Sequence, residues 1–203
     1  MSVPRFSAVI LAAGRSTRAG TTNKLLLPFK GGTVLGSVIR AVEESGADEI
    51  IIVTGYQAQR IEHVASSALK ASGKPWRVVR APDFMRGMSE SLKAGIEAVH
   101  PKSLGAVVCL GDMPLITHEV IDSLLDEYRA GDLAAIPTRE GKWGNPVLLS
   151  RALFPKVRAL TGDKGAKPIL ERLKGRLLFV PVDEEGVEID IDTPEDWEGI
   201  RED

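Results

Sequence analysis

The sequence predicts a doubly wound α/β fold built on a mostly parallel sheet, and three observations support this prediction. Short apolar runs alternate along the chain with segments whose apolar residues recur at helical spacing. Several of these runs are continuous rather than alternating, as expected of strands that are buried on both faces. Polar residues directly follow two of the runs, at the edge where such sheets bind ligands.

We expect five strands, with helices between them. The strands are expected at residues 8–11, 50–53, 77–79, 106–110 and 177–182. The helices are expected at residues 34–42, where the helix ends by Gly46, and at 61–69, 92–99 and 120–128. This succession predicts right-handed crossovers and ligands at the carboxyl ends of the strands. We assign the apolar stripes of the helices to core packing.

The pattern changes between about residues 140 and 176, where glycines, prolines and lysines gather. We expect a small lobe packed on the edge of the sheet within a single domain over 1–203, because roughly 35 residues are too few to hold a separate core. The last helix has a clear start, with Thr193 as the N-cap, Pro194 at the first helical position and Asp196 three residues after the cap. The preceding "VEIDID" is predicted to be the end of a strand.

Composition limits the possible functions. The chain of 203 residues is 43% hydrophobic, which is enough for one sizeable core. Its net charge of −2 provides no general attraction to nucleic acid or to an anionic membrane. The single cysteine, Cys109, excludes an internal disulfide and a cysteine zinc site, and we expect it to be a small buried apolar residue. A cytoplasmic protein without nucleic-acid or membrane partners is therefore expected.

A glycine-bearing cationic loop follows the first predicted strand. Gly14 and Gly20 bracket Arg15 and Arg18, and Lys24 follows. The spacing excludes the P-loop and the dinucleotide-binding fingerprint. A strand end, glycines that free backbone N–H groups and fixed cations nevertheless suit a triphosphate. The alternative is a solvated turn with surface cations.

Carboxylates follow two predicted strands. Asp112 lies just beyond residues 106–110, and Asp190 and Asp192 lie just before the last helix. The carboxyl ends of neighbouring strands meet at one crevice, so these side chains should face the cationic loop. Mg²⁺ typically takes one or two carboxylates together with substrate phosphates, and we rank Asp192 above Asp190 as a ligand. An isolated aspartate at such a position is more often a helix cap.

Six motifs along the chain carry a family resemblance. They are "LAAGRSTRAGTTNKLLLPFKG", "GMSESLKAG", "LGDMPLI", "GNPVLL", "TGDKGAKPIL" and "IDIDTPEDW". In this order they resemble nucleotidyltransferases of the molybdenum cofactor cytidylyltransferase type, within the MobA-like superfamily. The resemblance spans essentially the whole chain. It implies a Rossmann-like nucleotide-binding fold and Mg²⁺-dependent transfer of CMP from CTP to the terminal phosphate of molybdopterin cofactor, with release of pyrophosphate. A molybdoenzyme or its chaperone would receive the product.

The resemblance also implies roles for single residues, with a nucleotide-binding part at about 1–115 and an acceptor-binding lobe at about 140–176. It assigns Arg18, Lys24 and Asp112 to catalysis, and Asp112 and Asp192 to the metal. The nucleotide set is Leu11, Ala12, Ala13, Gly14, Ser16, Arg18, Lys24, Gly87, Ser89, Ser91 and Asp112. The acceptor set is Gly144, Asn145, Pro146, Asp163, Lys164, Gly165 and Lys167. Ser89 and Ser91 could equally serve as helix N-caps.

Three positions depart from the family pattern. Ala19 stands where methionine is usual, Asn145 where histidine is frequent and Lys167 where arginine is common. Lysine cannot reproduce the two-pronged hydrogen bonding of arginine to phosphate, so the acceptor is less well defined than the nucleotide. Guanylyl transfer to the same cofactor and nucleotidyl transfer to a sugar or isoprenoid phosphate remain alternatives. A non-catalytic, cofactor-binding chaperone for a molybdoenzyme is an alternative of a different class.

Overall fold

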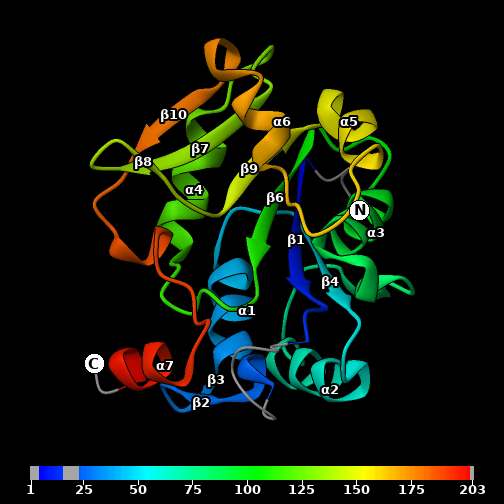
Figure 1. The fold of residues 1–203 in the computed structure, drawn as a ribbon, viewed down its shortest axis with the longest axis vertical. Helices are drawn as coiled ribbons and strands as arrows, with labels where there is room; N and C mark the ends of the chain where they lie inside the picture. Colours follow the sequence, from blue (N-terminus) through cyan, green and yellow to red (C-terminus); the bar gives the residue numbers. More distant parts are fainter. Residues whose placement is uncertain (1–4, 16–22, 202–203) are drawn as a thin grey trace.

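The computed structural model describes residues 5–15 and 23–201 and confirms the α/β class. An eight-stranded sheet in the order β10-β7-β9-β6-β1-β4-β5, with β8 paired to β7, forms its centre (Figure 1). The strands are β1 (Phe6–Ala12), β4 (Glu49–Thr54), β5 (Trp76–Arg80), β6 (Gly105–Leu110), β7 (Ala134–Arg139), β8 (Lys142–Trp143), β9 (Val147–Ser150) and β10 (Leu178–Pro181). A separate ribbon pairs β2 (Pro28–Phe29) with β3 (Gly32–Thr33).

Helices cover both faces of the sheet (Figure 1). One face packs against α1 (Val34–Glu44), α2 (Ala58–Ala68) and α4 (His118–Glu127), and the other against α3 (Met88–Ala98), α5 (Phe154–Arg158) and α6 (Lys167–Glu171). Successive residues of β1 point to opposite faces, so Ile10 lies in the first core and Val9 in the second. The fold is therefore doubly wound, as predicted.

The remaining helical segments are short or peripheral. They are η1 (Lys24–Leu26), η2 (Phe84–Arg86), η3 (Arg151–Leu153), η4 (Lys174–Arg176), η5 (Glu185–Val187) and α7 (Pro194–Arg201). The last helix begins as expected, because Asp196 N–H donates to Thr193 Oγ1 at 3.2 Å and Thr193 N–H donates to Asp196 Oδ2 at 2.7 Å. This reciprocal pair is a capping box. The side chain of Trp197 then packs α7 beside Phe29 of β2.

All five expected strands and the four expected long helices are confirmed, but the segment after residue 130 differs from prediction. β9 lies inside the sheet between β6 and β7, antiparallel to both, rather than in a lobe at the sheet edge. Its four residues are all buried. The neighbouring glycines and Pro146 are turn and loop signals, and a strand of four residues is too short to give a recognisable apolar pattern beside them. β7 was also missed, because Pro137 within it argues against an interior strand.

The segment "VEIDID" is not a strand end, and this prediction was wrong. Residues 188–193 form no regular element, and they dock onto loops rather than onto the sheet. Ile191 N–H donates to the Asp112 carbonyl at 3.0 Å, and Asn145 N–H donates to the Val187 carbonyl at 2.9 Å. These bonds satisfy backbone groups that a sheet ladder would otherwise pair.

Cys109 lies on β6 with 1% of its surface exposed. Burial raises the pKa of its thiol to about 12, so the thiol is protonated at neutral pH. We expect a disulfide reagent such as 5,5′-dithiobis(2-nitrobenzoate) to leave the folded protein unmodified at pH 8 and to release one equivalent of chromophore after denaturation. Rapid modification before denaturation would contradict this burial.

Within the described residues, no helix has both the length and the apolar character needed to cross a membrane.

Candidate functional site

Three aspartates and one lysine meet beyond the carboxyl end of β6. Carboxylate oxygens of Asp112, Asp190 and Asp192 all lie within 4.8 Å of one another, and we call these residues the carboxylate cluster. Lys24 Nζ lies 2.6 Å from Asp112 Oδ2 and 3.0 Å from Asp192 Oδ1. Only 12% of the Lys24 side chain is exposed, so solvent screens these pairs less than it would on an open surface.

Backbone contacts bring the cluster together. Gly111 N–H donates to the carbonyl of Leu11 at the end of β1, which holds the start of the loop after β6 against the neighbouring strand. The carbonyl of Asp112 accepts the hydrogen bond from Ile191 N–H, which places residues 190–192 alongside that loop. Aspartates that are about 80 residues apart in the sequence thus reach one point through main-chain bonds.

Lys24 reaches the cluster from a third segment. It begins η1, where Asn23 Oδ1 accepts a hydrogen bond from Leu25 N–H at 3.2 Å. Burial by itself lowers the pKa of Lys24, but the charges and hydrogen bonds of Asp112 and Asp192 together outweigh it and raise that pKa above its ordinary value. The ammonium group is therefore charged at neutral pH.

The carboxylate cluster also fits a divalent metal ion. Burial, followed by repulsion from Asp112 and Asp192, raises the pKa of Asp190, while Lys24 opposes that shift. A bound cation would relieve this repulsion. The donor set consists of carboxylate oxygens, which are the ligands that Mg²⁺ prefers. The sequence ranks Asp190 below Asp192 as a ligand, but in the structure a carboxylate oxygen of each residue lies within the same 4.8 Å of Asp112.

The cluster lines a cleft of about 500 Å³, which we call the Asp112 cleft. Most residues expected at the nucleotide reach its wall, namely Leu11, Ala13, Gly14, Lys24, Gly87, Ser91 and Asp112. Ala12 is buried in the sheet and Ser89 is fully buried in α3, so neither contributes to the wall. Ser16 and Arg18 lie outside the described residues.

Gly14 places no side chain on the wall of the Asp112 cleft. A Cβ at Gly14 would meet no atom of the described residues within 4 Å, and the residue does not adopt a positive φ. The described protein itself therefore imposes no requirement for glycine here. The missing side chain instead leaves room for a ligand to approach the backbone of the cleft wall.

The start of α3 is capped by a loop from the acceptor segment. Ser89 N–H donates to the Gly162 carbonyl at 3.2 Å, and Met88 N–H donates to Asp163 Oδ1 at 3.2 Å. These contacts satisfy N–H groups that a helix start leaves unpaired. The N-cap residue is Gly87, so neither Ser89 nor Ser91 serves as the cap. Asp163 thereby lies on the Asp112 cleft, beside α3.

The other acceptor residues divide between two places. Gly144, Asn145, Gly165 and Lys167 line a second cavity of about 250 Å³, together with Trp143 and several aliphatic side chains. We call it the Trp143 pocket. It shares Leu11, Met88 and Leu110 with the Asp112 cleft, so the two cavities adjoin. Pro146 follows Asn145 through a cis peptide bond and is buried.

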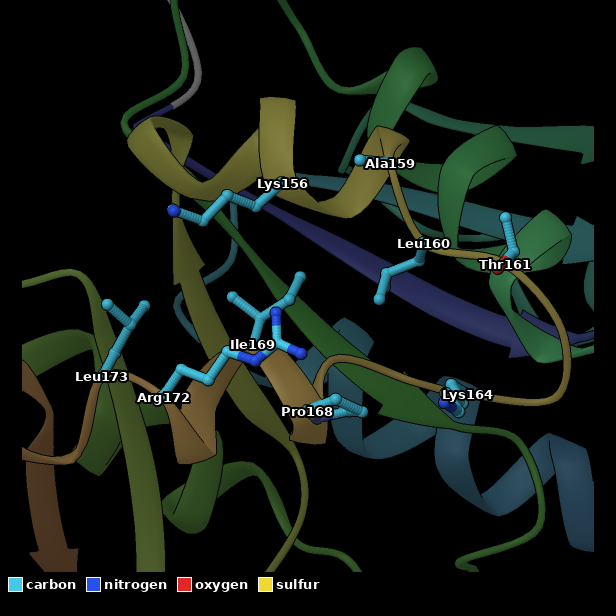
Figure 2. Close-up of a pocket in the computed structure, with 9 residues that line it drawn as sticks. All are labelled: Lys156, Ala159, Leu160, Thr161, Lys164, Pro168, Ile169, Arg172 and Leu173. Atoms are coloured by element: carbon cyan, nitrogen blue, oxygen red, sulfur yellow. The ribbon is translucent and has the colours of Figure 1, made fainter.

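Lys164 lines neither of these two cavities. It lines a third cavity, of about 340 Å³, between α5 and α6 (Figure 2). Lys156 and Arg172 also line this cavity, around an apolar floor that includes Leu160 and Ile169 (Figure 2). The structure thus separates Lys164 from the acceptor set with which it was predicted.

Sequence reasoning missed several residues on the walls of the Asp112 cleft. Arg15 and Arg86, to which the motifs assign no role, both supply cations to the cleft. Met88 lines both the cleft and the Trp143 pocket, and 39% of its surface is exposed. The motif "GMSESLKAG" contained Met88, but only its glycine and serines had been assigned.

A doubly wound sheet binds its ligands beyond the carboxyl ends of its strands, and the carboxylates and cations gathered there suit a metal ion and phosphate groups. Residues 8–177 match the MobA-like NTP transferase domain, and the chain belongs to that family. It is 29% identical to nicotine blue oxidoreductase of Paenarthrobacter nicotinovorans, over 95% of each chain. It is 27% identical to molybdenum cofactor cytidylyltransferase of Escherichia coli K12, over 96% of this chain and 94% of that one.

A solved structure shares the fold over nearly the whole chain. Rv0371C of Mycobacterium tuberculosis H37Rv, in complex with manganese, superposes with a TM-score of 0.79 at 28% identity, over 98% of each chain.

Proposed function

We propose that this protein catalyses Mg²⁺-dependent transfer of CMP from CTP to the terminal phosphate of molybdenum-loaded molybdopterin, with release of pyrophosphate. The observation that carries the proposal is the junction of the Asp112 cleft, with its carboxylate cluster and Lys24, and the Trp143 pocket. A triphosphate suits the first cavity and a flat heterocycle suits the second. The 27% identity to a molybdenum cofactor cytidylyltransferase supports the same pair of substrates.

The proposed chemistry requires positioning and charge more than a base. The attacking group is a phosphate monoester, whose second pKa is about 6, so it is already largely ionised at neutral pH. Lys24 and Arg15 line the Asp112 cleft, where their cations would neutralise the triphosphate and the departing pyrophosphate, and we assign Arg18 the same role. Asp112, Asp190 and Asp192 would hold Mg²⁺, which would supply charge stabilisation to the reacting phosphates.

The Trp143 pocket favours a heterocyclic acceptor over a sugar phosphate. Trp143 supplies an aromatic surface, and the aliphatic side chains of Leu92, Val108 and Ile136 line the same cavity. Aromatic side chains stack well on flat rings. Lys167 lines the same pocket, where its cation suits a phosphate. A sugar would instead require several polar partners for its hydroxyl groups.

The nucleotide is tested with a matrix of nucleotides and acceptors. We expect purified protein with Mg²⁺ and molybdenum-loaded molybdopterin to release pyrophosphate fastest with CTP, because "LAAG" and "GMSESL" resemble the cytidylyl relatives. Pyrophosphate release is followed for CTP, GTP, ATP and UTP, each with and without acceptor. Equal or faster release with GTP would replace the cytidylyl assignment by the guanylyl one. Binding of the cofactor without any release would favour the chaperone alternative.

The similarity to nicotine blue oxidoreductase defines a second candidate activity. The loop after β1 lacks the dinucleotide-binding fingerprint, which argues against a bound nicotinamide dinucleotide of the usual kind. The same matrix of assays therefore includes nicotine blue together with reduced nicotinamide nucleotide, and this reaction is monitored by absorbance. Turnover in that arm alone would identify an oxidoreductase.

A further inference from the structure

The carboxylate cluster already contains a cation supplied by the chain. Lys24 Nζ lies 2.6 Å from Asp112 and 3.0 Å from Asp192, where it contacts two of the three carboxylates that a metal ion would join. The Lys24 side chain is 12% exposed, which is less than the side chain of Asp112 at 21% or that of Asp192 at 33%. Lys24 therefore acts as the counter-ion that lets these carboxylates lie together in the free protein.

Lys24 also lines the cleft that would hold the triphosphate. Its backbone belongs to η1, whereas the carboxylates belong to the loop after β6 and to residues 190–192. The lysine side chain has four rotatable bonds, so its ammonium group can change partners without movement of the sheet. One group is thus positioned to serve two successive anionic partners.

We propose that Lys24 is an exchangeable counter-cation, which balances the carboxylate cluster in the free protein and transfers to the triphosphate when metal and nucleotide bind together. This inference rests on the proposed function. A divalent ion alone must compete with Lys24 for Asp112 and Asp192. A nucleotide offers Lys24 a new partner and frees those carboxylates, so each of the two ligands strengthens binding of the other.

The first test measures Mn²⁺ binding without nucleotide, by electron paramagnetic resonance of the free ion. We expect Lys24→Met to bind Mn²⁺ about tenfold more tightly than the wild type, because the competing cation is gone. Lys24→Arg retains the charge and should resemble the wild type. Lys93→Met is the matched control, since Lys93 also pairs with a carboxylate at 3.0 Å, that of Glu90, away from the cluster. Unchanged or weaker Mn²⁺ binding by Lys24→Met, or no binding by any variant, would overturn the proposal.

The second test measures coupling. Mn²⁺ affinity is determined with a saturating CTP analogue that carries a methylene group between the α- and β-phosphates, corrected for Mn²⁺ held by free nucleotide. The analogue should raise Mn²⁺ affinity by a larger factor in the wild type than in Lys24→Met. Equal factors in the two proteins would show that Lys24 does not couple the ligands.

A third test needs no change to the cluster and covers the case in which Lys24→Met fails to fold. Nitrogen NMR signals of lysine ammonium groups are followed in the wild type as Mg²⁺ is added, and the Lys24 signal is assigned with Lys24→Arg. With Mg²⁺ and the analogue, the Lys24 signal should shift while that of Lys93 stays constant. A constant Lys24 signal would overturn the proposal. The proposed reaction can fail separately. If the wild type transfers no nucleotide but nucleotide-free Lys24→Met still binds Mn²⁺ more tightly, the proposed reaction is refuted and the role of Lys24 in the free protein stands.

Discussion

Replacement of Asp112 by asparagine is expected to lower the rate of pyrophosphate release by ~10³-fold or more while leaving the fold intact. Asp112 belongs to the carboxylate cluster, and its carboxylate lies closer to Lys24 Nζ than that of Asp192 does. The substitution removes both a proposed metal ligand and a negative charge that pairs with Lys24, and single electrostatic groups in active sites contribute about 10²–10³ each. The fold should survive because the main-chain carbonyl of Asp112, which asparagine retains, accepts the bond from Ile191.

The measurement is a steady-state assay of pyrophosphate release, with circular dichroism and thermal unfolding recorded for each variant. Asp126→Asn is the matched control, because Asp126 lies on the exposed surface of α4 and its replacement by asparagine removes the same charge. We expect the control to retain full activity. Activity of Asp112→Asn within a few-fold of the wild type would remove Asp112 from the reaction.

Replacement of Gly87 by alanine is expected to have a large effect on both stability and nucleotide binding. Gly87 has φ +119° and ψ 174°, a conformation almost confined to glycine. An added Cβ would also collide with the backbone of Gly162 and lie 2.6 Å from Asp163 N. Strain and collision together should lower the free energy of unfolding by about 3 kcal/mol. The loop that caps α3 would be displaced, and with it Asp163 on the wall of the cleft.

Urea unfolding and calorimetric titration with the CTP analogue measure the two effects. Gly131→Ala separates strain from collision, because Gly131 also has a positive φ, +110°, but a Cβ there would meet no atom of the described residues within 4 Å. We expect Gly131→Ala to cost only about 1 kcal/mol and to bind the analogue normally. If the two alanine variants lose stability equally, contact between Gly87 and the loop at Gly162 does not constrain the site.

The parallel half of the fold was predictable because its signals are local and strong. Continuous apolar runs such as residues 50–53 and 106–110 are long enough to identify buried strands without reference to the rest of the chain. The capping box at Thr193 was equally local. β9 was not predictable in this way, since four residues beside Gly144 and Pro146 carry little periodic signal, and their place in the sheet depends on pairing with distant β6 and β7.

The site was predictable in its residue types but not in its contacts. Asp112, Asp192 and Lys24 followed from strand ends, glycines and the family motifs. Their direct ion pairs did not, because the distance between Lys24 and Asp192, which are separated by 168 positions in the sequence, depends on how the chain between them folds. The capping of α3 by Gly162 and Asp163 depends in the same way on a contact between segments that share no sequence pattern.

The antiparallel insertion of β9 has a consequence for protein engineering. Because Val147–Ser150 forms the junction between β6 and β7, residues 140–176 do not constitute a detachable cassette. A chimera that exchanges this stretch with a relative transplants an interior strand as well as one part of the wall of the Trp143 pocket. A chimera built to change the acceptor should therefore exchange β6 and β7 together with this stretch. Otherwise the two parent proteins must have matching side chains where β9 packs against its neighbours.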